Sequence, residues 1–173
     1  MPHVDQWRAT CFHEAAHAVF AQEVCGFKVH YVSAEEYYTA VRELAFGGWA
    51  DYWRLAMYTL AGSFAEQLEI WGEIRPEPLE EVLSGYEIEL EDLETFEEHP
   101  GDTLYLVKYL KAMSADPMDG DLEENYRIVV KDTEEEVRRR WSEIKAVAEM
   151  LERCGRLEGE EVAALIAPQQ PPK

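Results

Sequence analysis

Apolar residues recur at helical spacing in two segments of the N-terminal half. The later segment, about residues 51–71, repeats large apolar side chains on one helical face: Leu55, Leu60, Phe64, Leu68 and Trp71. The earlier segment, residues 5–25, is rich in alanine, with Asp5 suited to cap its start and Gly26 suited to end it. Both segments are therefore predicted to be helices.

Between these two helices the chain is rich in residues that favour strands. FKVHYVS, residues 27–33, predicts a strand, and YYTAVRELAF, residues 37–46, is compatible with a second, edge strand at its start. Gly47 and Gly48 end the pattern. We expect a small β-sheet in the N-terminal third.

The C-terminal half is predicted to be helical. A helix begins near Asp102, and DPMDG, residues 116–120, forms a turn after it. Residues 121–154 follow as one long helix or as two helices joined near Arg140. A last short helix, residues 159–166, precedes a proline-rich tail, 168–173, that we expect to be disordered.

Residues 73–100 are different in character, because prolines and glutamates replace the apolar periodicity. We expect a long acidic connection or insertion here, with a short helix or a hairpin at most. It is either a solvated surface segment or one that favours basic substrates or gates a site. The whole pattern predicts one mainly helical (α+β) domain over residues 1–167, with its small sheet near the N-terminal third.

The charge balance limits the possible partners. The chain has 36 acidic and 16 basic residues, a net charge of −20, which disfavours nucleic acids. It has no run of 18 uncharged apolar residues and no signal peptide at its start, so we expect no membrane partner. The three cysteines are odd in number and form no CxxC pair. We therefore expect a soluble, cytoplasmic protein with reduced thiols.

The stretch FHEAAHAVF, residues 12–20, places two histidines and a glutamate on the first predicted helix. His13-Glu14-Ala15-Ala16-His17 fits the pattern HExxH. Residues at i and i+4 lie on one helix face, about 6 Å apart, so both imidazoles reach a single Zn²⁺ ion. Glu14 lies beside that ion and is placed to act as a general base on water that the metal activates.

A catalytic zinc ion takes a third protein ligand and leaves its fourth position open. The sequence offers Glu66, His99 and Asp102 as candidates, and His3 or His30 less readily. Glu66 lies on the second predicted helix, four residues after Gly62, which would allow close packing against the first helix. The alternatives without a metal are that Glu66 is a solvent-exposed helix residue and that Asp102 is an N-cap of its helix.

Four segments together resemble the protease domain of the FtsH family of ATP-dependent zinc metalloproteases. TCFHEAAHAVFAQEV followed by VHYVS is similar to the HExGH helix and next strand of that family, and YTLAGSFAEQLEIWG to its LxGRAAEExxFG helix. HPGDTLYLVKYLKAM is similar to its GxxxDxxxAxxLARxMV segment, and AVAEMLERCGRLEGEEVAALI to its C-terminal pattern. The resemblance covers most of residues 9–166, with poor matches in 73–100 and 115–140.

The resemblance implies a zincin-like metallopeptidase fold with definite residue roles. His13 and His17 are zinc ligands, Asp102 is the third ligand, and Glu14 is the catalytic base. Glu66 takes the role of a carboxylate that orients a ligating histidine. The strand around Val29, His30, Tyr31 and Val32, or the edge strand after it, is expected to pair with an extended substrate.

The chain also departs from the family pattern. Ala16, Ala61 and Ser63 replace a glycine, a glycine and an arginine, and the sequence carries no Walker A motif, AAA module or transmembrane helix. We therefore expect an ATP-independent zinc endopeptidase that cleaves flexible or unfolded polypeptides. Its candidate protein partners are a separate unfoldase and further copies of the same chain. The alternative is a catalytically silent zinc scaffold that acts as a binding or adaptor module.

Overall fold

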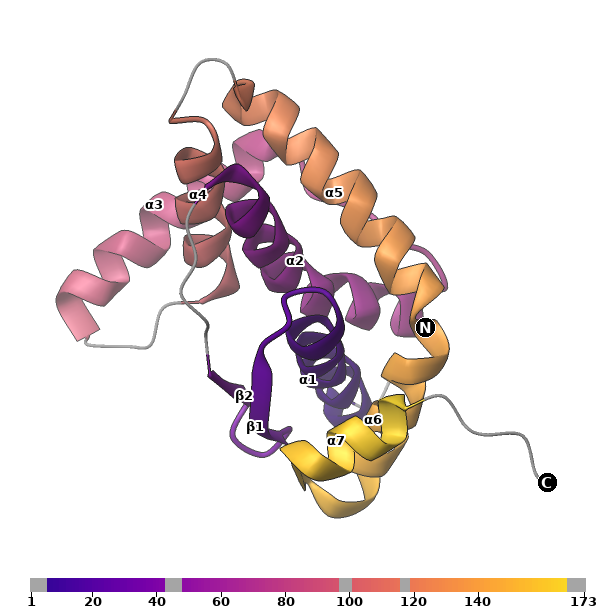
Figure 1. Cartoon of the computed structure of the whole chain (residues 1–173). Helices are drawn as coiled ribbons and strands as arrows, with labels where there is room; N and C mark the ends of the chain where they lie inside the picture. The colour runs from indigo at the N-terminus through magenta and orange to yellow at the C-terminus, as the bar shows by residue number, and fades with distance from the viewer. Residues whose placement is uncertain (1–5, 43–47, 97–100, 116–118, 168–173) are drawn as a thin grey trace.

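The computed structural model describes residues 6–42, 48–96, 101–115 and 119–167 of the chain. The described residues form seven helices and three short strands (Figure 1). In chain order these are α1 (Gln6–Glu23), β1 (Lys28–Ser33), β2 (Tyr38–Arg42), α2 (Trp49–Trp71), α3 (Leu79–Phe96), α4 (Asp102–Met113), α5 (Leu122–Arg139), α6 (Trp141–Cys154), β3 (Arg156–Glu158) and α7 (Gly159–Ile166). The expectation of a mainly helical domain with a small sheet near the N-terminal third is confirmed.

Helix α1 lies at the centre of the fold, and α2, α6 and the sheet pack around it (Figure 1). Most of its length is buried on every side, because alanines alternate with large apolar residues such as Phe12, Val19 and Phe20. Alanine side chains let neighbouring elements approach closely. The polar residues that α1 carries in this buried stretch, His13, Glu14 and His17, therefore need partners from the surrounding elements.

The three strands form an antiparallel sheet in the order β2-β1-β3. β1 pairs with β2 from Lys28 to Ser33, with an irregularity between Val29 and Tyr31, and pairs with β3 through its last three residues. Sequence reasoning did not predict β3. Its presence makes β1 the central strand, so that β2 and β3 are the edge strands of the sheet among the described residues.

This order corrects the expected substrate strand. Tyr31 and Val32 already have strand partners on both sides. Gly159, the first residue of α7, lies so close to Val29 that an added Cβ atom would sit 1.9 Å from its carbonyl oxygen. Of the two strands that the sequence offered for substrate pairing, β1 is therefore central and β2 lies at an edge of the sheet.

Helix α3 is a second correction, because it occupies most of the predicted acidic connection. Its 18 residues begin just after Pro78, whose carbonyl accepts hydrogen bonds from the backbone of Glu81 and Val82. Leu79, Val82, Leu83 and Tyr86 follow at helical spacing and pack on the core. The abundance of glutamate concealed this short apolar stripe, although acidic residues in a first helical turn favour a helix.

The other expected boundaries agree closely with the structure. Residues 121–154 form two helices that are separated at Arg140, and the last helix spans the predicted residues 159–166. Residues 116–118 of the predicted turn and the tail 168–173 lie outside the described residues. Within the described ranges, no helix combines the length and apolar character needed to cross a membrane.

Candidate metal centre

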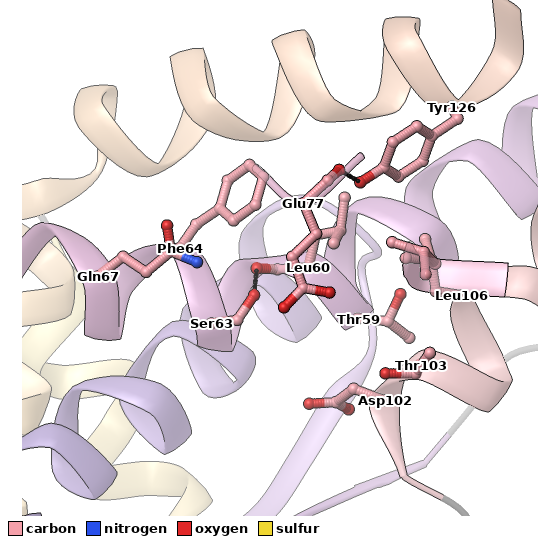
Figure 2. Close-up of a pocket in the computed structure, with 11 residues that line it drawn as sticks. Thr59, Leu60, Ser63, Phe64, Gln67, Glu77, Asp102, Thr103, Leu106 and Tyr126 are labelled. Atoms are coloured by element: carbon pink, nitrogen blue, oxygen red, sulfur yellow. Dashed lines mark hydrogen bonds between the residues drawn. The ribbon is translucent and has the colours of Figure 1, made fainter. Parts of the chain in front are cut away.

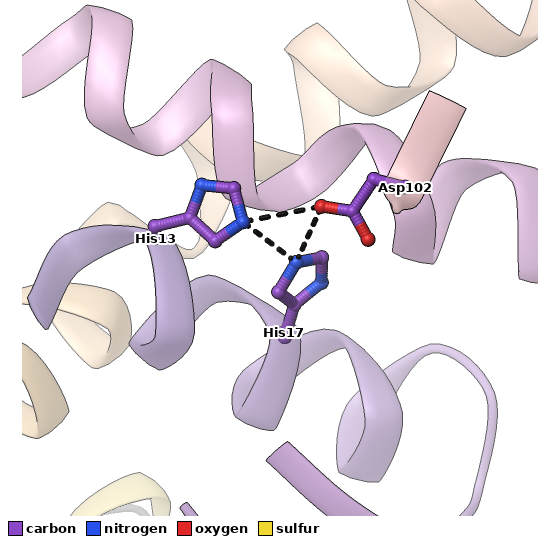
Figure 3. A group of neighbouring side chains, drawn as sticks. All are labelled: His13, His17 and Asp102. Carbon is purple, nitrogen blue, oxygen red and sulfur yellow. Dashed lines mark hydrogen bonds and ion pairs between the residues drawn. The ribbon is translucent and has the colours of Figure 1, made fainter. Parts of the chain in front are cut away.

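The two histidines of α1 project from one face of the helix toward the same point (Figure 3). Their Nε2 atoms are 3.1 Å apart, and their rings meet edge to face with centroids separated by 4.8 Å. The His17 side chain is 6% exposed and that of His13 is 24% exposed. The i, i+4 spacing therefore brings two imidazole nitrogens together at a partly enclosed site, as the sequence predicts.

Asp102 completes this group from the first residue of α4. Its Oδ2 atom lies 3.1 Å from His13 Nε2 and 3.2 Å from His17 Nε2 (Figure 3). The three atoms form a nearly equilateral triangle. Ligand atoms that share one tetrahedral zinc ion at bond lengths near 2.1 Å are about 3.4 Å apart, so the triangle is close to the size of one face of such a coordination shell.

The outer nitrogen of each ring has a partner that orients it. His17 Nδ1 lies 2.9 Å from the backbone carbonyl oxygen of Tyr58, which only accepts hydrogen bonds. His13 Nδ1 lies 3.4 Å from Glu66 Oε2. With Nδ1 as the donor, each neutral ring turns the lone pair of Nε2 toward Asp102.

Three electron-rich atoms then face one another at 3.1–3.2 Å, so the group needs a cation or a proton between them. Two imidazole nitrogens and one carboxylate oxygen are also a donor set that suits Zn²⁺. The residues thus fit the metal that the sequence predicts.

In the metal-free protein a proton takes the place of the cation. Burial lowers the pKa of His13, but hydrogen bonds with Asp102 and Glu66 outweigh it and raise that pKa from 6.5 to about 10. Burial would raise the pKa of Asp102, but the two histidines reverse this effect and hold it well below its usual value. Asp102 is therefore ionised and His13 protonated near neutral pH.

Gly62 is the residue that lets α2 approach the centre. An added Cβ atom there would lie 2.6 Å from Nε2 of His13 and 2.6 Å from Nε2 of His17. Cβ atoms essentially never come that close to other atoms, so any larger residue would displace the histidines. The close packing that the sequence suggested for Gly62 is confirmed.

Glu14 is buried beside the histidines and has a defined partner. Glu14 is only 4% exposed, and its Oε2 atom accepts a hydrogen bond of 2.9 Å from the Thr39 hydroxyl. Thr39 lies on β2 and is itself buried. A strand far from HExxH in sequence thus fixes the predicted base, a contact that no motif in the sequence signalled.

Tyr58 of α2 also borders the centre. Its ring packs on that of His17, with centroids 4.8 Å apart and planes tilted by 43°. Burial raises the pKa of Tyr58 well above its usual value, and the carboxylates of Asp102 and Glu14 raise it further. The Tyr58 side chain therefore lies within the electrostatic reach of a predicted ligand and of the predicted base.

A cavity of about 120 Å³ adjoins the centre (Figure 2). Asp102 and Thr103 of α4 border it, Leu60 and Phe64 of α2 give it an apolar wall, and the carboxylate of Glu77 points into it. The Glu77 backbone is held in place, since its carbonyl accepts a hydrogen bond of 2.6 Å from the Tyr126 hydroxyl. This cavity has room for one medium-sized side chain next to a metal ligand.

The remaining candidate ligands fall elsewhere. Glu66 contacts the outer nitrogen of His13 and does not reach the group of Nε2 atoms, which matches the orienting role expected for it. His30 is exposed on β1 and is not part of the cluster, and His3 and His99 lie outside the described residues. Among the described residues, His13, His17 and Asp102 are the group whose ligand atoms converge.

Comparisons with known proteins do not assign a family to this chain. No protein-family model matches it, and no curated protein is significantly similar to it. The resemblance to FtsH proteases therefore depends on the motif segments of the sequence alone.

Zinc binding is expected to release protons, because zinc must displace the proton that His13 holds below a pKa of about 10. Calorimetric titrations at pH 7.5 in buffers of different ionisation enthalpy should give about one proton released per ion. The apparent affinity should rise roughly tenfold per pH unit toward pH 10 and then level off. Binding heats that are independent of the buffer would contradict the assigned role of His13.

Proposed function

We propose that this chain is a zinc-dependent endopeptidase that hydrolyses peptide bonds in flexible or unfolded polypeptides. The observation that carries this proposal is the convergence of Nε2 of His13, Nε2 of His17 and Oδ2 of Asp102, with Glu14, the residue after His13, buried on the same helix. Three protein ligands with one open side are typical of catalytic zinc sites, whereas structural sites usually have four. The resemblance to the FtsH protease domain supports the same conclusion.

Each residue around the centre has a separate role in the proposed hydrolysis. A zinc ion bound there would polarise the peptide carbonyl and lower the pKa of water. Glu14 takes a proton from the attacking water and passes it to the nitrogen of the leaving amine. Thr39 keeps the Glu14 carboxylate oriented, while Glu66 and the Tyr58 carbonyl keep the histidine rings turned inward.

An extended substrate fits beside β2. The outer edge of this strand is unpaired among the described residues, and β2 carries Thr39, the partner of Glu14. A peptide added to this edge would run past the predicted base. The cavity beside Asp102 would receive one of its side chains.

The three cysteines support a cytoplasmic location. They are odd in number and form no CxxC pair, a pattern typical of proteins in reducing compartments. We expect folded substrates to need a separate unfoldase, because the cavity accepts a single side chain and β2 accepts an extended chain. Homo-oligomerisation stays a prediction.

The alternative is a zinc scaffold that binds partners without cleaving them. The exposed Tyr37 and Tyr38 at the start of β2 favour it, because exposed aromatic residues often mark docking surfaces. Both proposals require the same metal centre, and they differ in whether Glu14 performs chemistry.

Glu14→Gln distinguishes the two proposals. The amide keeps the size of the side chain but cannot accept the proton, so hydrolysis of an unfolded protein such as casein should fall by at least about 10²-fold while zinc content is unchanged. Glu23→Gln, on the same helix, is the matched control and should keep full activity. Equal rates in the Glu14 variant and the wild type would exclude Glu14 as the base.

Thr39→Val tests the positioning of the base. Valine has the shape of threonine but no hydroxyl, so kcat should fall about tenfold while KM and zinc content stay nearly the same. Thr39→Ser restores the donor and should recover most of the lost rate. A change confined to KM would instead assign Thr39 to substrate binding.

A further inference from the structure

The ring of Tyr58 packs against His17 at the metal centre. The proposed function leaves one requirement open, which is a donor for the oxygen that becomes negative when the peptide carbonyl is attacked. We propose that Tyr58 is a catalytic residue whose hydroxyl donates a hydrogen bond to this oxygen. This inference rests on the proposed function.

The backbone of α2 directs Tyr58 toward the centre. Tyr58, Gly62 and Glu66 follow one another at intervals of four residues, so they share one face of the helix. Gly62 touches both histidines, Glu66 contacts His13, and the Tyr58 carbonyl is 2.9 Å from His17 Nδ1. His17 therefore contacts Tyr58 twice, once at the backbone carbonyl and once at the aromatic ring.

The Tyr58 side chain lies against a predicted metal ligand, because its ring packs on the ring of His17 with centroids 4.8 Å apart and planes tilted by 43°. Among the described residues its hydroxyl has no hydrogen-bond partner, and it is not sealed in the core, because no buried side-chain oxygen there lacks a partner. A phenol hydroxyl in this position remains free to donate to a substrate.

Other hydroxyl groups nearby are already engaged. The Thr39 hydroxyl donates to Glu14, that of Ser63 to the carbonyl of Leu60, and that of Thr59 to the carbonyl of Ala56. Thr103, which lines the cavity next to Asp102, is the remaining rival. Tyr58 is favoured over Thr103 because its ring and its backbone carbonyl both contact His17, a predicted ligand of the centre.

The chemistry of this step is simple. The oxygen of water bonds to the carbonyl carbon, the π electrons of the carbonyl move onto its oxygen, and Glu14 takes the proton released from water. Tyr58 keeps its own proton and stabilises the new negative charge through a hydrogen bond. That bond is stronger in the transition state than with the neutral carbonyl, so it accelerates the reaction and does not merely tighten binding.

The first test is kinetic. A peptide that the wild type cleaves well is chosen from a fluorogenic library, and Tyr58→Phe, Thr103→Val and Tyr86→Phe are compared on it. Tyr58→Phe should lower kcat by about 10²-fold with nearly unchanged KM and zinc content. Tyr86→Phe is the matched control, because the Tyr86 ring of α3 lies under Lys111 of α4 and phenylalanine preserves this contact.

The second test measures binding without turnover. A phosphonate analogue of the same peptide imitates the tetrahedral, negatively charged state, and calorimetry gives its affinity for each zinc-loaded variant. Tyr58→Phe should weaken the phosphonate by at least about tenfold. In a Glu14→Gln background, Tyr58→Phe should leave the affinity for the uncleaved peptide within about twofold of its value with Tyr58 present.

The outcomes separate the two proposals. Wild-type rates and phosphonate affinity in Tyr58→Phe, with Glu14→Gln inactive, would overturn the role of Tyr58 and leave the peptidase proposal standing. A selective loss in Thr103→Val would likewise overturn it and transfer the role to Thr103. A zinc-loaded wild type that cleaves no member of the library would overturn the proposed function, and the role of Tyr58 with it.

Discussion

The contact between α1 and α2 at Gly62 is the constraint on which the rest of the centre depends. A Cβ atom at this position would lie 2.6 Å from both histidine Nε2 atoms, so only glycine lets the two helices meet there. This approach brings the Tyr58 carbonyl to His17 and Glu66 to His13, and both contacts orient the rings toward Asp102. Because Gly62 has no side chain, groups from α1, α2 and α4 can meet at the centre.

The surroundings explain why polar residues are tolerated in the most buried helix of the fold. Each charged or polar side chain of the centre has a partner on another element: Glu14 on β2, His13 on α2 and α4, and His17 on α2 and α4. Burial of such groups is costly unless they are paired. The residual cost is the mutual approach of three electron-rich ligand atoms, which a cation relieves.

The sequence predicted the local placement of the two histidines better than the long-range geometry. The spacing of His13 and His17 on a helix fixes their common face before any fold is known, and Asp102 followed from the resemblance to the FtsH pattern. Thr39 and Tyr58 could not be found in this way, because their roles come from the pairing of β2 with β1 and from the rotation of α2 against α1. Strand β3 was missed because three residues are too few for a periodic signal, and it pairs with the side of β1 that β2 leaves open. Helix α3 has four apolar residues at helical spacing, but the many glutamates around them led to the prediction of an acidic connection.

The central claim is that His13, His17 and Asp102 hold one zinc ion, and elemental analysis of the purified protein tests it most directly. Zinc should be present at about one ion per chain in the wild type and lost in His13→Ala. The control is His30→Ala, which removes an exposed histidine outside the cluster and should keep the metal. Wild-type protein that takes up no zinc even when it is supplied, or His13→Ala protein that retains a full equivalent, would contradict the account.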